Sequence, residues 1–434
     1  MLSKMELTMV DPIRATRRQF LKAAASTVAV PYVIAGSALG AGGRAAPSER
    51  LVLGAIGCGG QGMRHVGGGI WVQGGGYLSK PDVQVVAVSD VNRRNLDNAK
   101  KVVDKRYGNQ DCATYKDFRQ LLARPDIDII LCATGDRWHT PVSIAAAKAG
   151  KDIYCEKPIS LTVYEARTLA REIKRYGRIF QTGTQQRSWY EFRFACELIR
   201  NGYIGDVKRI KVNVGGPPEE CNLPAGGPPP EWLDYDAWLG QAPWRPFHPE
   251  IMSWMRWKDY SGGEMTNWGT HMFDIAQWAM GMDESGPVEI IPPGGKEHPV
   301  LTYRYASGAI MTREPISQTT PGVRFEGTRG MVEVTREALI TEPDSLRRQK
   351  IGPNEIHLYE SKEHPDNFLD CVRTRKRPAS DADVGYRSIT VCHLGNIAYW
   401  LKRPLRWDPV KEQFANDPEA DRTLWREMRA PWQI

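Results

Sequence analysis

Residues 51–62 read Leu51-Val52-Leu53-Gly54-Ala55-Ile56-Gly57-Cys58-Gly59-Gly60-Gln61-Gly62, an apolar run that leads directly into a glycine-rich turn. The apolar run has the length and composition of a strand buried in a parallel sheet. The turn fits the pattern G-x-G-x-x-G, in which Gly57 permits a tight turn, Gly59 lets the backbone approach a diphosphate and Gly62 lets the next helix pack closely. The backbone N–H groups at the start of that helix favour a bound diphosphate. The predicted cofactor contacts in this turn are Gly57, Gly59, Gly60, Gln61 and Gly62.

A second apolar strand, over residues 83–89, ends at Asp90. A carboxylate in this place accepts hydrogen bonds from the adenosine ribose hydroxyls of NAD and repels the 2′-phosphate of NADP. Asp90 lies 28 residues after the turn, whereas about 20 is usual, and the glycine-rich stretch 67–76 accounts for the delay. The expected cofactor is NAD, and Arg93 and Arg94 leave NADP open as an alternative.

Strands and helices continue to alternate along the first half of the chain. The predicted elements are a helix over 92–105, a strand over 127–133, a helix over 141–149 and a strand over 152–155. Strands that alternate with helices in this way form a parallel sheet with helices on both faces. We therefore predict an α/β fold that begins with a Rossmann dinucleotide-binding domain over residues 45–186.

Length and composition agree with a folded protein of more than one domain. The chain has 434 residues, and at about 150 residues per domain this length predicts two or three domains. A content of 41% hydrophobic and 25% charged residues excludes disorder over most of the chain. The net charge is +7, but residues 1–44 hold six basic and two acidic side chains, which leaves +3 for the rest. A surplus this small gives no argument for a nucleic-acid partner.

Residues 1–44 are predicted to be a twin-arginine signal peptide. Paired arginines stand in the run Thr16-Arg17-Arg18-Gln19-Phe20-Leu21-Lys22, and a mildly apolar segment follows over 23–39. Pro31 and Gly36 interrupt this segment, so no stable membrane span is expected once the signal is removed. A retained membrane anchor and a disordered tail are the alternatives. The expected location is the periplasm or another exported site, reached with the cofactor already bound.

The cysteines form no recognisable framework. They are scattered and include no C-x-x-C pair, at Cys58, Cys112, Cys132, Cys155, Cys196, Cys221, Cys371 and Cys392. We expect buried structural thiols and no metal site. Disulfides remain an alternative outside the cytoplasm.

Three motifs lie around the carboxyl edge of the predicted parallel sheet. Glu156-Lys157-Pro158 follows the strand over 152–155, and a Lys at this edge points into the crevice where dinucleotides and substrates meet. Thr134-Gly135-Asp136-Arg137-Trp138-His139 lies upstream, and Gly183-Thr184-Gln185-Gln186-Arg187-Ser188 lies downstream. With these motifs the chain resembles the Gfo/Idh/MocA oxidoreductases, the group of glucose-fructose oxidoreductase and inositol dehydrogenase, over nearly all of residues 50–410. Its resemblance is greatest to an exported branch.

The resemblance implies a C-terminal α+β domain over residues 187–434 with a large, mostly antiparallel open sheet. The exposed face of this sheet makes subunit contacts, so a homo-oligomer, a dimer or a tetramer, is expected. Strands are predicted from the sequence over 207–214, 300–305, 309–313, 323–326 and 331–334. Lys157 is expected beside the nicotinamide and the substrate hydroxyl. The further cofactor contacts are Thr134, Trp138 near the nicotinamide pocket, His139 and Glu156, although Thr134–His139 also fits a helix N-cap pattern.

A further motif of the family is a glycine-rich turn followed by D-x-G-x-H on a helix. It reads here Gly262-Gly263-Glu264-Met265-Thr266-Asn267-Trp268-Gly269-Thr270-His271-Met272-Phe273-Asp274. Asn267 and His271 are four residues apart and share a helix face, but an amide cannot accept a proton as the usual Asp can. His271 is therefore the predicted proton-transfer group. Asp274 is expected to orient the imidazole or to bind a second hydroxyl, and the alternative is that both side chains only cap or cross-link the helix.

Tryptophans concentrate in the same region. Seven lie within 47 residues, at Trp232, Trp238, Trp244, Trp254, Trp257, Trp268 and Trp278. Flat aromatic faces stack on sugar rings, so a carbohydrate ligand is consistent with this cluster, although most of its members are expected to serve packing. The predicted substrate contacts are Trp268 and, after a strand that leads to the same crevice, Gln185 and Arg187.

Three functions follow as hypotheses. The first is an exported NAD(P)-dependent oxidoreductase that transfers hydride between a sugar hydroxyl and a tightly bound nicotinamide. The second is an NAD-dependent glycosidase that uses transient oxidation and elimination. The third is a non-catalytic sugar or nucleotide binder, which depends on Asn267 alone.

Overall fold

The computed structural model describes residues 45–70, 72 and 74–434, of which residues 50–434 form one folded unit. The predicted signal peptide over 1–44 lies outside the described residues. The short 3-10 helices are η2 (Pro47–Glu49), η3 (Tyr77–Ser79), η4 (Gln185–Ser188), η5 (Pro249–Met252), η6 (Trp254–Arg256), η7 (Asp344–Arg348) and η8 (Arg422–Leu424).

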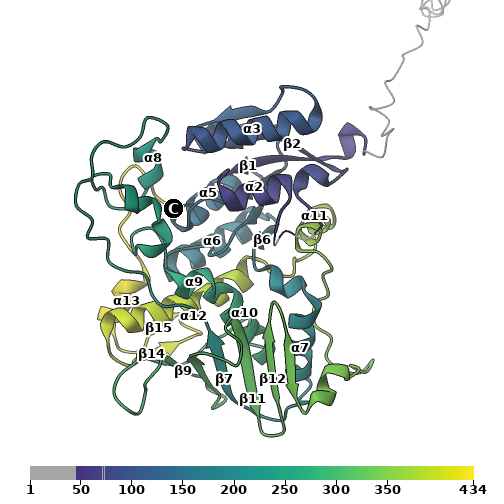
Figure 1. Ribbon diagram of the computed structural model, residues 1–434, viewed down its shortest axis with the longest axis vertical. Coiled ribbons are helices and arrows are strands. Elements are labelled where there is room, and N and C mark those ends of the chain that lie inside the picture. Colours follow the sequence, from purple (N-terminus) through teal and green to yellow (C-terminus); the bar gives the residue numbers. More distant parts are fainter. Residues whose placement is uncertain (1–44, 71, 73) are drawn as a thin grey trace, which may run out of the picture. The chain divides into compact units, whose positions relative to one another are not determined.

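The glycine-rich turn follows the central strand of a parallel sheet. Within the described part of the chain this sheet has six strands in the order β3-β2-β1-β4-β5-β6, and it lies in the upper part of Figure 1, where β1, β2 and β6 are labelled. The strands are β1 (Leu51–Ile56), β2 (Val83–Ser89), β3 (Ala113–Tyr115), β4 (Ile129–Cys132), β5 (Asp152–Cys155) and β6 (Phe180–Thr182). The strand order reverses between β1 and β4, and dinucleotides bind in the crevice at such a reversal. The predicted Rossmann sheet is confirmed.

The strands are joined by helices with local sequence signals at their ends. The helices are α2 (Gly60–Gly67), α3 (Arg93–Tyr107), α4 (Phe118–Leu122), α5 (Asp136–Lys148) and α6 (Val163–Tyr176). In α6 the Thr162 hydroxyl accepts a hydrogen bond from the Glu165 backbone N–H at 3.1 Å, and the Glu165 carboxylate accepts one from the Leu161 N–H at 2.6 Å. This reciprocal arrangement satisfies donors that the first turn leaves open. The helix ends at Gly177, whose φ of 60° suits glycine.

The second sheet is mostly antiparallel, as expected. In the described residues its nine strands run in the order β13-β12-β11-β7-β10-β9-β8-β14-β15, and among them β10 and β7 pair in parallel. The strands are β7 (Val207–Asn213), β8 (Glu289–Ile291), β9 (Thr302–Arg304), β10 (Ile310–Arg313), β11 (Gly322–Gly327), β12 (Met331–Thr335), β13 (Leu339–Glu342), β14 (Leu405–Asp408) and β15 (Gln413–Phe414).

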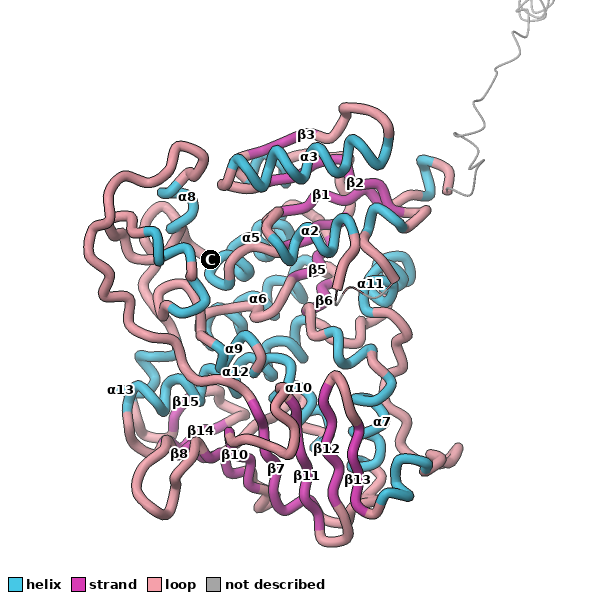
Figure 2. The backbone as a smooth tube through the Cα atoms, in the orientation of Figure 1, coloured by secondary structure: helices cyan, strands magenta, loops and turns pink. Residues whose placement is uncertain are grey.

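Helices cover one face of this sheet (Figure 2). Helix α7 packs on β12, α10 packs on β7 and β11, and α12 packs on β8. The helices of this half are α7 (Tyr190–Arg200), α8 (Tyr235–Leu239), α9 (Glu264–Asn267), α10 (Gly269–Met280), α11 (His364–Thr374), α12 (Ala382–Leu401) and α13 (Pro418–Asp421). No helix in the described part of the chain is long and apolar enough to cross a membrane.

Two of these late helices return to the first domain. Helix α12 packs against both α6 and α10, so it links the helix layers of the two sheets. In α11 the His364 ring lies with Nε2 2.8 Å from the Thr182 carbonyl oxygen at the end of β6, and the Gln181 amide donates to the His364 carbonyl at 2.6 Å. The contacts across α6, α11 and α12 hold the second half of the chain against the first.

The aromatic cluster is largely core. Trp238, Trp257 and Tyr260 are buried with apolar neighbours between residues 221 and 260. All eight cysteines are buried and free. Most of the tryptophans in the described cluster therefore serve packing, which leaves few of them for a ligand.

A buried ion-pair cluster joins η4 to helices α10 and α12. The Arg187 guanidinium donates to both oxygens of Asp274 at 2.7–3.0 Å and to Asp283 at 2.7 and 3.0 Å. The Ser388 hydroxyl donates to Asp274 at 2.6 Å. The side chains of Arg187 and Asp274 are only 2% and 1% exposed. The predicted roles of Arg187 as a substrate contact and of Asp274 as a partner of the imidazole are corrected by this placement, because the two groups bind each other inside the protein.

We predict that this cluster stabilises the fold strongly. The substitution Asp274→Asn leaves the buried Arg187 with less compensation, and removal of one partner of a buried pair costs about 3–5 kcal/mol. The free energy of unfolding in urea measures this loss. The matched control is Asp97→Asn, which breaks the Arg93–Asp97 pair at 3.6 Å with side chains 72% and 69% exposed and should cost less than about 1 kcal/mol. Equal losses in the two variants would contradict the prediction.

Candidate active site

The glycine-rich turn has the shape that a diphosphate requires. Gly57 has a φ of +87°, and a Cβ there would lie 2.5 Å from the Ala133 backbone. A Cβ on Gly62 would lie 1.9 Å from the Gly57 carbonyl oxygen, so neither position accepts a side chain. By contrast, a Cβ on Gly59 would have no neighbour closer than 3.9 Å, and one on Gly60 none within 4 Å. Helix α2 begins here without a side-chain cap, so the open space lies at backbone N–H groups that suit a diphosphate.

Asp90 ties this turn to the end of β2. Its carboxylate accepts hydrogen bonds from the Cys58 backbone N–H at 2.7 Å, the Asn92 N–H at 2.8 Å and the Asn95 amide at 3.3 Å. Asp90 therefore stands beside the turn, where a ribose would lie next to the diphosphate. The two arginines that left NADP open face other groups. Arg93 pairs with Asp97, and Arg94 lies 4.6 Å from the Trp232 ring centre.

Glu156 turns toward helix α2. One carboxylate oxygen lies 2.5 Å from His65 Nε2 and 3.4 Å from the Gln61 amide nitrogen, which donates to it. Burial raises the pKa of Glu156, but the hydrogen bond and charge of His65 and the charge of Lys157 outweigh burial and lower it to about 2. Glu156 is thus a permanent anion at the crevice. His65 was missed in the sequence, where its one signal is its position one helical turn after Gln61.

The ammonium of Lys157 reaches from the first sheet to helix α9. Its Nζ donates to Asn267 Oδ1 at 2.6 Å and to the Asn267 carbonyl oxygen at 3.2 Å. The Asn267 amide in turn donates to both oxygens of Glu264 at 3.2 Å. Burial lowers the pKa of Lys157 and nearby Glu156 opposes that effect. Asn267, at the position where the family motif has Asp, thus keeps a hydrogen bond to Lys157. The nearest carboxylate on this helix belongs to Glu264, one turn earlier, which was not predicted as a site residue.

His271 lies at the start of α10 among cations. Its Nε2 is 3.3 Å from Arg336 Nη2, and its ring centre is 5.8 Å from that of Trp268. Burial, Lys157 and Arg336 hold the pKa of His271 well below its usual range. The imidazole is therefore neutral at physiological pH. Because a guanidinium only donates, Nε2 carries the lone pair of the ring and Nδ1 the proton.

The motif Thr134–His139 serves mainly to build the site. The Trp138 ring packs between Gly240 and Trp432, whose ring centre is 4.6 Å away, so its predicted place in the nicotinamide pocket is corrected: this ring is core. His139 lies with Nδ1 2.6 Å from the Pro158 carbonyl oxygen and so holds the turn that carries Lys157. The Thr134 hydroxyl donates to the Gly135 carbonyl at 3.3 Å.

Buried polar groups complete the crevice. The Asp136 carboxylate accepts a bond from the Ser261 hydroxyl at 2.7 Å, and burial raises its pKa to about 7. Gln185 is 8% exposed, and its amide oxygen has no hydrogen-bond partner among the described residues. Cys132, His139 and Cys155 also lie together, with ligand-type atoms within 4.8 Å of one another. Burial raises the pKa of the Cys155 thiol, and a protonated thiol is a poor metal ligand.

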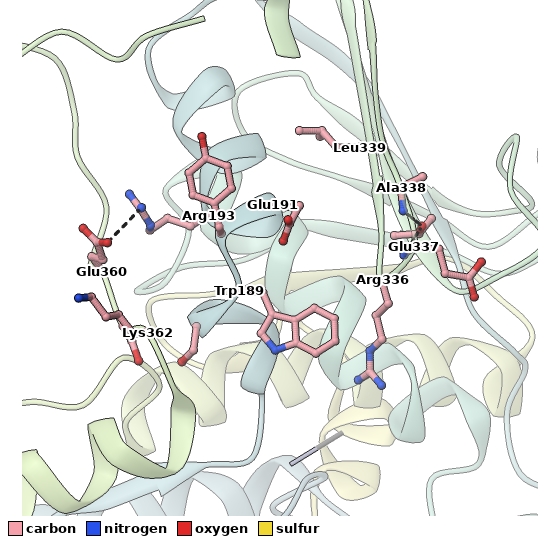
Figure 3. Close-up of a pocket in the computed structure, with 13 residues that line it drawn as sticks. Trp189, Glu191, Arg193, Arg336, Glu337, Ala338, Leu339, Glu360 and Lys362 are labelled. Atoms are coloured by element: carbon pink, nitrogen blue, oxygen red, sulfur yellow. Dashed lines mark hydrogen bonds and ion pairs between the residues drawn. The ribbon is translucent and has the colours of Figure 1, made fainter. Parts of the chain in front are cut away.

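Two cavities adjoin these residues. The first, of about 530 Å³, lies between η4, the start of α7 and the β12–β13 turn, with Trp189 and Arg336 in its wall (Figure 3). The second, of about 460 Å³, lies between the Pro-rich loop after β7 and the segment before α9. Its wall includes Trp254 and Glu264. Both volumes are within the range of small-molecule sites.

Comparison with known proteins agrees with this geometry. Residues 53–184 match the description "Oxidoreductase family, NAD-binding Rossmann fold", and residues 221–434 match "Oxidoreductase family, C-terminal alpha/beta domain", both of the Gfo/Idh/MocA group. The chain belongs to the Gfo/Idh/MocA oxidoreductase family. Its first domain is an NAD-binding Rossmann domain.

Relatives within the family differ in the names of their activities. The chain is 27% identical over 350 residues to myo-inositol 2-dehydrogenase of Thermotoga maritima. The matched region covers 76% of this chain and 92% of the relative. It is 29% identical over 210 residues to glycosyl hydrolase family 109 protein 1 of Shewanella sp. strain MR-4, 44% of each chain. The crystal structure of scyllo-inositol dehydrogenase from Lactobacillus casei with NAD(H) and scyllo-inositol has the same fold. It has a TM-score of 0.54 and 16% identity, over 82% of this chain and 99% of that one.

We predict that Gly59→Ala weakens NAD binding without loss of the fold. The protein has room for the methyl group, but a diphosphate must approach the backbone at this point. Titration with NADH, followed by its fluorescence, should show affinity reduced at least about tenfold, a loss of about 1.4 kcal/mol. The control is Gly286→Ala, a position whose Cβ would meet no described atom within 4 Å. Unchanged NADH affinity in the Gly59 variant would contradict the assigned diphosphate position.

Proposed function

We propose that the protein is an NAD-dependent dehydrogenase of a sugar or sugar derivative. The observation that carries this proposal is the convergence of Lys157, Asn267 and a neutral His271 at the carboxyl edge of an NAD-binding sheet. NAD, when bound, supplies the acceptor for the hydride of a hydroxyl-bearing carbon. The sequence similarity to myo-inositol 2-dehydrogenase of Thermotoga maritima supports a polyhydroxylated substrate.

Each residue of the site has a role in this reaction. His271 Nε2 takes the hydroxyl proton, because its lone pair is available on a neutral ring. The Lys157 ammonium donates a hydrogen bond to the same oxygen and stabilises the negative charge that develops there. Asn267 holds the ammonium at 2.6 Å, and Glu264 orients the amide of Asn267. A 3.3 Å contact with Arg336 occupies His271 Nε2 in the structure, so substrate must replace it.

The cofactor preference and the location belong to the same proposal. Asp90 faces the turn while Arg93 and Arg94 face Asp97 and Trp232, which supports NAD over NADP. A twin-arginine signal would export the folded protein with NAD already bound. We also propose that the protein forms a homo-oligomer through the exposed face of the second sheet. An exported enzyme has little free NAD, so we propose that the cofactor is tightly held and recycled on a second substrate.

The second candidate function is NAD-dependent glycoside cleavage. It is favoured by the similarity to glycosyl hydrolase family 109 protein 1. In this reaction a transient ketone acidifies the neighbouring C–H, and loss of that proton with the departing glycosidic oxygen leaves an unsaturated ketone. Water adds to its double bond and the ketone is reduced again, so the net reaction is hydrolysis without net oxidation. The same proton acceptor and ammonium serve both reactions.

We predict that the purified protein carries bound nucleotide and converts a free sugar or polyol to the keto product. Mass spectrometry after denaturation identifies the nucleotide, and a panel of sugars with carbonyl trapping identifies the product. Release of free sugar from glycosides without a keto product would assign the second function. Protein that neither releases nor binds a nicotinamide nucleotide would contradict both.

The pH dependence tests the role of His271. The imidazole must be neutral to take a proton, and its pKa lies well below 6.5, so kcat/KM should be lost only as pH falls well below 6.5. His271→Gln should lower kcat by about 10²–10⁴ and remove this acidic limb. The exposed His357→Gln serves as control and should change neither. Asp136, whose pKa is about 7, interacts electrostatically with Lys157 and could add its own titration to the pH profile. The Asp136→Asn variant removes that titration and so separates it from the titration of His271. An unchanged acidic limb in the His271 variant would contradict the assignment.

A further inference from the structure

Arg336 brings a cation from the second sheet to the proposed catalytic histidine. It follows β12 directly and lies in the turn before β13. The guanidinium carbon is 4.6 Å from the Trp268 ring centre and 5.5 Å from that of Trp189. Its Nη2 is 3.3 Å from His271 Nε2. The cation is thus flanked by two indole rings and directed at the atom that takes the substrate proton.

The same guanidinium forms part of a cavity wall. Figure 3 shows the Arg336 side chain beside the Trp189 ring, while the carboxylate of the neighbouring Glu337 is directed away from both. At the far side of this cavity Glu360 lies 3.6 Å from Arg193. The cavity of about 530 Å³ has room for a sugar ring between these groups, and the Trp189 indole in its wall suits the C–H surface of such a ring.

The cation is partly removed from water. Burial lowers the pKa of Arg336 to about 10, with Glu156 opposing that effect, so the group keeps its charge at neutral pH. Glu156 itself is bound by His65 at 2.5 Å. A planar guanidinium in such a place binds a carboxylate or sulfate with two parallel hydrogen bonds, more strongly than it binds neutral groups.

We propose that Arg336 binds an anionic group of the substrate, so that the site selects sugars that carry a carboxylate or a sulfate ester. This inference deepens the proposed dehydrogenase or glycosidase function and rests on the same site. The shared chemistry is an oxyanion placed beside the sugar carbon that reacts.

An anion on Arg336 also prepares the reaction. The guanidinium that donates to His271 Nε2 occupies the lone pair needed for the hydroxyl proton. When the guanidinium turns to an oxyanion, Nε2 becomes available. The anion also offsets one of the charges that hold down the pKa of His271, so the imidazole becomes a stronger base. Acidic substrates should therefore gain in kcat as well as in binding.

The test uses matched probes on the full chain with NAD. Methyl glucuronide and methyl glucoside 6-sulfate are compared with methyl glucoside, and the galacto series is treated likewise. Tryptophan fluorescence measures binding, since Trp189 lines the cavity and Trp268 contacts the Arg336 guanidinium, and carbonyl trapping measures turnover. At least one acidic probe should bind 10-fold to 100-fold more tightly than its neutral counterpart. Whether the glucuronide or the 6-sulfate does so shows whether the site prefers a carboxylate or a sulfate.

Variants assign this preference to Arg336. Arg336→Gln should abolish it while neutral probes keep their affinity within about threefold, and Arg336→Lys should retain part of it. Arg329→Gln, in the β11–β12 turn at the other end of the strands, removes the same charge and should change nothing. If Arg336→Gln does not fold, the wild-type comparison of probes decides alone.

The outcomes separate this inference from the proposed function. Equal binding of acidic and neutral probes, or an equal loss of both in Arg336→Gln, overturns the anion site. Turnover of neutral sugars without acid preference does the same and leaves the dehydrogenase intact. Selective binding of an acidic probe that is never converted supports the anion site and overturns the catalytic proposal.

Discussion

The hydrogen bond of 2.6 Å between Lys157 Nζ and Asn267 Oδ1 connects the two halves of this protein at the proposed active site. A partly buried ammonium needs acceptors, and the first domain offers it the nearby charges of Glu156 and Asp136. The acceptor comes from helix α9 of the second domain. This requirement couples the position of the substrate half to the sheet edge where NAD binds, and α11 and α12 stabilise the same arrangement from the other side.

Charge is distributed unevenly around this bond. Lys157 and Arg336 lie on the substrate side with His271, which burial and these two cations keep neutral. Glu156 stands toward the glycine-rich turn, ionised because His65 binds it. A neutral imidazole among cations is a good acceptor for the proton of a sugar hydroxyl and a natural neighbour for an anionic substituent. The substitution of the usual Asp by Asn fits this pattern, since it avoids an anion beside Lys157 and leaves Glu264 as the nearest carboxylate on α9.

Local chemistry made part of this site readable from the sequence. Gly57 and Gly62 are required by backbone geometry, and Asp90 and Lys157 follow strands whose carboxyl ends must meet at one edge. Other assignments failed because helical spacing tells which side chains share a face and not what that face meets. Asp274 follows His271 by less than a turn, yet its carboxylate binds Arg187 in a cluster that also contains Asp283 and Ser388. The His271 imidazole contacts Arg336 instead. Trp138 likewise meets Trp432 from the far end of the chain.

The sequence by itself determined the parallel sheet and the NAD-binding turn, because each depends on residue types at short, fixed spacings. It singled out Lys157 and His271 separately, each within a short motif that resembles those of the family. The tertiary structure decided which polar groups are consumed inside the protein and which face the crevice. His65 and Arg336 entered the site only through contacts between elements distant in the chain, whereas Glu264 contacts Asn267 within helix α9. No local pattern marks such residues, since their role arises from packing of the second sheet and its helices against the first domain.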